Sequence, residues 1–132
     1  MKQSTPSLDQ WLREAKQEPT APLCGMYLAH NGTVRQTARA KVRQGAEDTA
    51  PVTGMYFDYD PQKLEAAVAA ARALPGIYHV RVWLNRGELA LGDDIMLVLI
   101  GGDIRPRVID ALQNLVGTIK NECVVERERS AP

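Results

Sequence analysis

The chain contains little of several residue types that mark particular classes of protein. Aromatic residues make up 5% of its 132 residues, and there are two cysteines, Cys24 and Cys123. Two cysteines this far apart do not form the close pairs typical of a structural zinc site. Buried thiols in a reducing compartment are the favoured interpretation, and a disulfide or a reactive nucleophile are the alternatives.

The sequence also lacks net charge and long apolar runs. Its 16 Lys and Arg residues balance 16 Asp and Glu residues. Because nucleic-acid-binding domains usually carry a basic excess, we expect no nucleic-acid partner. No segment approaches the roughly 20 apolar residues that cross a bilayer, and the polar segment 1–16 has no apolar core of a secretion signal. We therefore expect no membrane association and a cytoplasmic location.

The sequence does contain a regular succession of helix and strand signals, and a chain of this length fits one domain. We predict helices over 8–16, 61–74 and 104–120, strands over 24–34, 52–59, 77–84, 95–100 and 123–126, a tight connection over 87–92, and a charged end that frays. This order predicts an α+β fold with three helices and a mixed sheet, in a single domain covering residues 1–132.

Cations gather in the long segment 35–51, which contains Arg35, Arg39, Lys41 and Arg43 before its first acid. Loops of this length inside a compact domain are usually functional or disordered. Arginine offers a planar fork of donors that suits phosphate and carboxylate groups. The segment is therefore either an anion-binding loop or a solvated loop, and composition alone favours the second.

Two further places combine polar groups in a way that suits an anion. Gly101-Gly102 precede the helix that carries Arg105, and helix N-termini attract anions through free N–H groups. Alternatively, Asp103 caps that helix and its arginines face water. Lys120 ends the same helix, where it either interacts with the helix dipole or lies in a pocket as a nucleophile or proton carrier.

Histidine gives no sign of a metal site. His30 and His79 each stand alone, without a second ligand at metal spacing. The sequence also contains no Walker loop, nucleophile elbow or dinucleotide fingerprint. The residues by themselves therefore indicate a small α+β protein with an anion site formed by arginines and one lysine.

Several motifs resemble the large, catalytic subunit of molybdopterin synthase. Gly32-Thr33-Val34-Arg35 resembles the family's G-x-V-R, and the segment 87–93, Gly-Glu-Leu-Ala-Leu-Gly-Asp, resembles its G-E-L-x-x-G-[DE] turn. Arg105 falls on the arginine of a His-Arg pair, and Lys120 on the lysine that closes the last helix. The correspondence covers about residues 25–127, and we identify the chain as a divergent member.

The resemblance implies an α/β-hammerhead fold, a homodimer, and a small ubiquitin-like sulfur carrier whose C-terminal Gly-Gly tail enters each copy to give a heterotetramer. The implied reaction moves sulfur from the carrier's thiocarboxylate to cyclic pyranopterin monophosphate and makes molybdopterin, in molybdenum cofactor biosynthesis. It implies no metal or organic cofactor. Lys120 and Arg127 are the catalytic candidates by this resemblance, and Arg35, Arg39 and Arg105 are the candidates for binding the pterin phosphate.

The chain departs from the family at some of its signature positions. Ile104 replaces the histidine before the helix arginine, and Leu84-Asn85 replaces a second His-Arg pair. Val124-Val125-Glu126-Arg127 replaces the Pro-x-Trp-Lys ending. Loss of histidine removes a proton carrier that works near neutral pH. The alternative hypothesis is therefore a non-catalytic paralogue that binds a carrier tail or a pterin-type anion.

Overall fold

The computed structural model describes residues 2–38, 45 and 50–130. Its elements, in chain order, are α1 (Leu8–Ala15), the 3-10 turn η1 (Ala21–Leu23), β1 (Met26–Thr33), β2 (Val52–Tyr59), α3 (Pro61–Arg72), β3 (Ile77–Leu84), β4 (Gly87–Ala90), β5 (Asp94–Gly102), α4 (Arg105–Thr118), the π-helical turn η2 (Ile119–Cys123) and β6 (Val124–Ser130). Arg39, Lys41 and Arg43 lie outside the described residues.

The strands form two three-stranded antiparallel sheets, a large one in the order β1-β5-β3 and a small one in the order β4-β2-β6. The predicted α+β fold with three α-helices is confirmed for the described residues, but the prediction of a mixed sheet was wrong. Parallel neighbours require a crossover that returns to the same sheet. Here α3 leads from β2 to β3 and α4 leads from β5 to β6, so each helical crossover passes from one sheet to the other.

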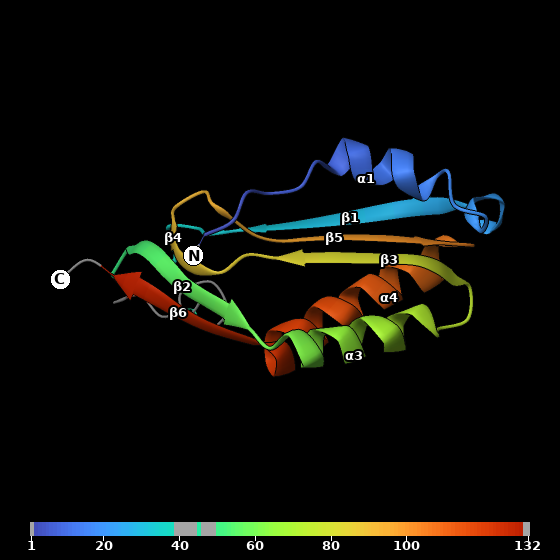
Figure 1. Cartoon of the computed structure of the whole chain (residues 1–132). Helices are drawn as coiled ribbons and strands as arrows, with labels where there is room; N and C mark the ends of the chain where they lie inside the picture. Colours follow the sequence, from blue (N-terminus) through green and yellow to red (C-terminus); the bar gives the residue numbers. More distant parts are fainter. Residues whose placement is uncertain (1, 39–44, 46–49, 131–132) are drawn as a thin grey trace.

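The large sheet is covered on both faces. In Figure 1, α1 lies on one side of β1, β5 and β3, while α3 and α4 lie on the other. Strand β5 is buried over nearly its whole length because it is the central strand between two covered faces. Leu97 and Leu99 pack under Trp11 of α1, whereas Met96, Val98 and the side chains in register with them pack toward the helices on the other face.

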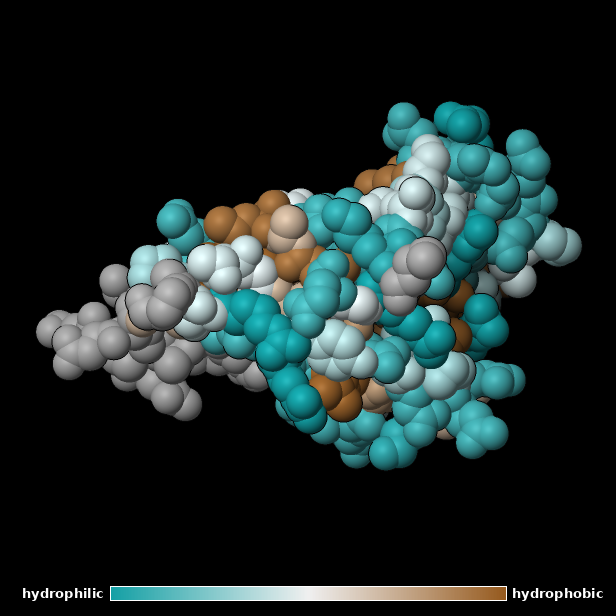
Figure 2. Space-filling view, turned by 60° about the vertical axis from the view of Figure 1, so that its left-hand side comes forward, coloured by the Kyte–Doolittle hydropathy of each residue, from teal (hydrophilic) through white to brown (hydrophobic). Residues whose placement is uncertain are grey.

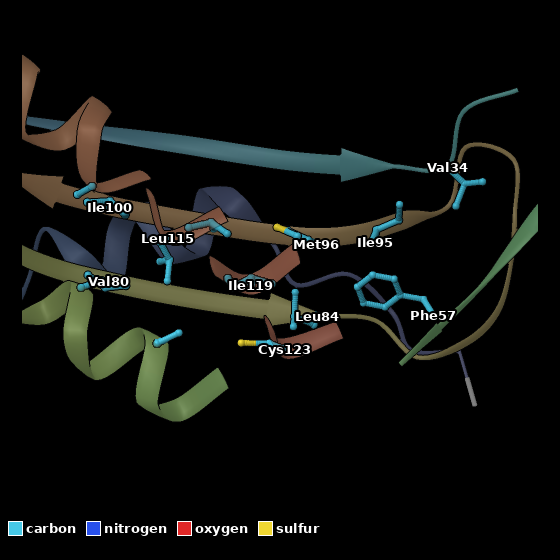
Figure 3. Close-up of a cluster of buried hydrophobic side chains, with 14 of the residues drawn as sticks. Val34, Phe57, Val80, Leu84, Ile95, Met96, Ile100, Leu115, Ile119 and Cys123 are labelled. Carbon is cyan, nitrogen blue, oxygen red and sulfur yellow. The ribbon is translucent and has the colours of Figure 1, made fainter. Parts of the chain in front are cut away.

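The main core lies between the large sheet and the helices α3 and α4. Figure 3 shows Met96 and Ile100 of β5 near Leu115 of α4 and Ile119 of η2. Phe57 of β2 joins this core and is fully buried. By contrast, the face in Figure 2 is mostly hydrophilic, with hydrophobic residues only in small groups. The apolar contacts therefore hold the two sheets and two helices together as one core.

Two helix starts follow from capping residues in the sequence. The Ser7 hydroxyl accepts a hydrogen bond from the Gln10 amide at 3.2 Å. The Asp60 carboxylate accepts from the amides of Gln62 and Lys63, and Pro61 occupies the first position of α3. These bonds satisfy N–H groups that a helix start leaves without partners. The predicted starts of both helices are confirmed.

Two predicted irregular segments are strands. Residues 87–90, expected inside a tight connection, form β4 and pair with Gly54–Phe57. The charged end, expected to fray, extends as β6 to Ser130 because it pairs with β2 along its length. Arg129 also forms a 2.8 Å ion pair with Glu88 of β4. Both corrections arise from cross-strand partners distant in the sequence.

Both cysteines are free thiols, as expected, with Cys123 buried and Cys24 half-buried. Gly101 and Gly102 are buried at the end of β5, and they serve packing. A Cβ atom on Gly101 would lie 2.6 Å from the Tyr27 ring, and one on Gly102 would lie 2.6 Å from the Gly76 carbonyl oxygen. The Asp103 carboxylate binds the Ile104 amide and Arg107. These contacts leave the glycines no surface for a ligand.

Candidate functional site

A cavity of about 210 Å³ lies where the large sheet meets the small one. Its apolar lining consists of Met55, Ile95 and Met96, and Gly32 and Thr33 of β1 also line it. Five ionisable side chains from distant parts of the sequence reach it: His30, Arg35, Lys120, Glu126 and Glu128. Two of them are cations, two are carboxylates and one is a histidine, so the cavity combines charge with groups that can exchange protons.

Lys120 reaches the cavity because its neighbours in η2 are fixed in the core. Ile119 is fully buried and Cys123 is 4% exposed. The Cys123 carbonyl accepts a hydrogen bond from the Asp60 amide at 2.9 Å, which ties η2 to the start of α3. Lys120 is half-buried and lines the cavity. The sequence left open a contact with the helix dipole or a pocket with a catalytic role. Lys120 lines a cavity, and its catalytic role stays a prediction.

Strand β6 presents its acids to the cavity and its arginines to the opposite face. Glu126 pairs with Phe57 and Glu128 pairs with Met55, whose side chains belong to the core. Directly opposed residues in a ladder share a face, and successive residues alternate faces. Arg127 pairs with Tyr56 and therefore lies on the outer face of the small sheet. The Glu126 Oε1 atom is buried without a hydrogen-bond partner in the described part of the chain.

His30 projects from β1 toward the helices, on the same face as Leu28. Its Nε2 atom is buried and has no hydrogen-bond partner within the described residues. Burial lowers the pKa of His30 below its ordinary value, and the positive charge of Lys120 lowers that pKa further. The imidazole is therefore mainly neutral at pH 7, in which form one ring nitrogen is a free acceptor.

The predicted arginines are divided among different places. Arg35 lines the cavity, and its Nε donates to the Thr37 carbonyl oxygen at 3.0 Å. Arg105 is exposed at the first position of α4, the end of that helix distant from η2 (Figure 1). The 14 residues of α4 rise about 20 Å. One chain therefore brings Arg35 and Lys120 together, but neither Arg105 nor Arg127 joins them, and Arg39 lies outside the described residues.

The residues that sequence reasoning missed are His30, Glu126 and Glu128. The signal available in the sequence was the alternation of side chains between the two faces of a strand. His30 precedes Gly32 by two positions, so both lie on one face of a strand, and the Glu-Arg-Glu-Arg run at 126–129 separates acids from bases in the same way. The sequence did not indicate which of the two faces points inward.

Across residues 2–38, 45 and 50–130, no three or more His, Cys, Asp or Glu side chains are grouped as a metal site requires. In that same part of the chain, no helix has the length and apolar character for crossing a membrane.

Solved structures with the same fold come from the molybdopterin pathway. Molybdopterin synthase from Staphylococcus aureus superposes with a TM-score of 0.73 at 15% identity, over 96% of this chain and 86% of that one. The molybdopterin biosynthesis MoaE protein from Burkholderia ambifaria gives 0.69 at 21% identity, over 97% and 85%. A complex of subunits 1 and 2 of molybdopterin-converting factor from Helicobacter pylori gives 0.65 at 19%, over 96% and 80%. At these identities the likeness shows the fold.

Comparison with curated proteins found no significant match. The family model of the MoaE protein, however, matches residues 2–122, which is most of the chain and includes His30, Arg35 and Lys120. The earlier resemblance to the large subunit of molybdopterin synthase is thereby confirmed. The chain belongs to the MoaE protein family.

Proposed function

We propose that this chain is the catalytic subunit of a molybdopterin synthase, which transfers sulfur from a thiocarboxylated carrier to cyclic pyranopterin monophosphate. The observation that carries the proposal is the meeting of Arg35 and Lys120 in one cavity, in a chain of the MoaE family. The two residues are far apart in the sequence, and the fold brings both to the same cavity.

The chemistry of the reactants suits these cations. The acceptor carries a phosphate and the donor ends in a thiocarboxylate, so two anions must approach one another. Opposite charges in the site reduce the repulsion that would oppose this approach. Arg35 can hold one of the anions with its planar donors, since its guanidinium keeps its charge over the whole physiological pH range.

Lys120 is the proposed catalytic residue. When a nucleophile attacks the acyl carbon of the carrier tail, negative charge develops on the acyl oxygen. An ammonium group fixed beside that oxygen stabilises the charge more in the transition state than in the ground state, which is the requirement for catalysis. An alternative role in the same place is transient capture of the acyl carbon by the Lys120 amine.

The proposed partners follow from the family and from its solved relatives. The Helicobacter pylori neighbour is a complex of two subunits of molybdopterin-converting factor, which supports a small ubiquitin-like carrier as partner here. A homodimer is proposed for a separate reason. Arg105 lies about 20 Å from the Lys120 end of α4, so it can take part at the cavity only if a second copy supplies it. The proposed location is the cytoplasm.

A single-turnover assay tests the function. The full-length protein is mixed with thiocarboxylated carrier from the same cell and with cyclic pyranopterin monophosphate, and the dithiolene product is measured. The unaltered protein should form product, Lys120→Ala should fold normally and form none, and Lys63→Ala, an exposed lysine on α3, should retain the rate. Turnover by Lys120→Ala would remove its role. Carrier binding without product from the unaltered protein would instead identify a non-catalytic paralogue.

A further inference from the structure

His30 is among the cavity residues that the sequence comparison did not assign to the reaction. Its imidazole lines the cavity together with Lys120 of η2 and Glu126 of β6. The residue directly opposite His30 on β5 is Val98, an apolar neighbour that offers no hydrogen bond to the ring from its side chain. The Nε2 atom is buried and has no hydrogen-bond partner in the described part of the chain.

A buried ring nitrogen without a partner is costly for stability. Gly32 lies beside this nitrogen, and a Cβ atom at that position would lie 3.7 Å from the His30 Nε2 atom, an ordinary contact distance. The cavity therefore lies next to a nitrogen that has an unused capacity to accept or donate a proton.

The electrostatic surroundings keep this nitrogen available as a base. The charged groups that line the cavity with it are Lys120 from η2, Glu126 and Glu128 from β6, and Arg35 following β1. Burial lowers the pKa of the imidazole and the Lys120 ammonium lowers it further. The neutral form, which can accept a proton, is therefore the main form at pH 7.

Sulfur transfer from a thiocarboxylate needs such a group at one defined step. Once the sulfur has bonded to the acceptor carbon, it is held in a thioester with the carrier's acyl group. The oxygen of a water molecule then bonds to the acyl carbon, one water proton passes to a base, and the carbon–sulfur bond breaks with its electron pair leaving on sulfur. The base returns its proton to the sulfur, so thioester and water become carboxylic acid and thiol.

We propose that His30 is this base, taking the proton from the attacking water and giving it to the departing sulfur, while Lys120 stabilises the charge on the acyl oxygen. The inference rests on the proposed function. His30 lies on β1 and lines the same cavity as Lys120.

The test compares two matched variants in the single-turnover assay. His30→Gln keeps a hydrogen-bonding side chain but cannot carry a proton. His79→Gln makes the same change on β3, where His79 contacts Glu18 outside the cavity. General acid–base groups contribute about 100-fold or more to rate. We expect His30→Gln to slow product formation by about 100-fold with carrier affinity unchanged, and His79→Gln to stay within about twofold.

Two readouts separate a proton-transfer role from a structural one. The rate of the unaltered protein should rise with pH to a plateau set by a pKa below 6.5, and this dependence should vanish in His30→Gln. In the protein without substrates, an NMR titration of the histidine ring should show the pKa of His30 rising when Lys120→Gln removes the neighbouring charge.

The possible outcomes distinguish an error in the role of His30 from an error in the proposed function. Product formed by the unaltered protein together with a His30→Gln rate within about threefold would overturn the role of His30 alone. So would a slow His30→Gln enzyme that keeps the unaltered pH profile, because that result indicates a structural role. Absence of product from the unaltered protein would overturn the proposed function and, with it, this step.

Discussion

Glu126 lies directly opposite Phe57 in the ladder between β2 and β6, so the two side chains share the core-facing side of the small sheet. Phe57 is fully buried, and the Glu126 carboxylate continues from it into the cavity. An acid in a cavity proposed for anions opposes binding through like-charge repulsion. The position therefore limits how tightly an anion is held.

Glu126→Gln should accordingly strengthen anion binding. Removing one charge roughly 8 Å from an anion changes the binding free energy by about 0.5–1 kcal/mol at this partly exposed site, which is about two- to sixfold in affinity. The measurement is calorimetric titration with a synthetic peptide ending in a Gly-Gly carboxylate. Glu122→Gln, an exposed acid of η2 outside the cavity, is the matched control. Equal gains in both variants would show that only net charge matters.

A mixing experiment tests whether a second copy supplies Arg105. Lys120→Ala and Arg105→Ala are each expected to lose product formation. If a two-fold dimer builds each site from Lys120 of one copy and Arg105 of the other, a mixed dimer contains one intact site. Random exchange of subunits should then restore about a quarter of the activity. No recovery, with exchange verified by mass spectrometry of differently tagged copies, would exclude a shared site.

His30 also makes stability depend on pH. Its pKa is lower in the folded protein than the ordinary 6.5 of the unfolded chain. Between these two values the unfolded chain binds more protons, so the free energy of unfolding falls as pH decreases through this window. Urea titrations at pH 7.5, 6.5 and 5.5 should show this fall in the unaltered protein and a smaller one in His30→Gln.

The exposed carboxylates do not affect the comparison of the unaltered protein with His30→Gln, because they change stability only at lower pH. The Arg81 hydrogen bond lowers the pKa of Glu14, the Arg129 hydrogen bond lowers the pKa of Glu88, and the Ala90 amide lowers the pKa of Asp93. Their stabilising contributions are present above their ordinary values of 4.5 and 3.8 and are lost only below them. Parallel stability curves for the unaltered protein and His30→Gln above pH 5 would contradict the expectation.

Alanine substitutions at two glycines should change the stability of the protein in opposite directions. A Cβ atom on Gly102 would lie 2.6 Å from the Gly76 carbonyl oxygen and 2.7 Å from Val108, so Gly102→Ala should destabilise by about 1–3 kcal/mol. Gly117, inside α4, has open space around the same position. Gly117→Ala should stabilise by about 0.5–1 kcal/mol because alanine favours the helix. Urea denaturation measures the free energy of unfolding of both variants. A change in the same direction in both would contradict the packing described for Gly102 and Gly117.

Local signals in the sequence were sufficient for the ends of several elements. Ser7 and Asp60 fix two helix starts because their side chains bond amides two or three positions away. The strand predicted at 77–84 matches β3 at both ends. Sequence could not show that Gly101 serves packing, since the contacting Tyr27 ring is distant along the chain. Contacts of that kind depend on the tertiary fold.

Only part of the candidate site was predicted from the sequence. Lys120 and Arg35 were identified from residue type and resemblance, and both reach the cavity. Arg127 was matched to a family lysine by its position in the sequence, yet its side chain lies on the other face of β6 from the cavity. Its predicted catalytic role stays a prediction. His30 was not selected as a site candidate, because the sequence alone does not show that β1 brings this histidine near Lys120 of η2.

The π-helical turn at 119–123 has a consequence for how such a protein can change in evolution. The turn sets the register in which β6 joins β2, and a one-residue slip moves every side chain of a strand to the opposite face. In β6 the inward residues are Glu126 and Glu128, and the outward residues are Arg127 and Arg129. Deletion of a single residue from the turn would exchange the two rows. One such event would replace the acids of the cavity wall by arginines without any substitution, and would add positive charge to a cavity that already contains Arg35 and Lys120.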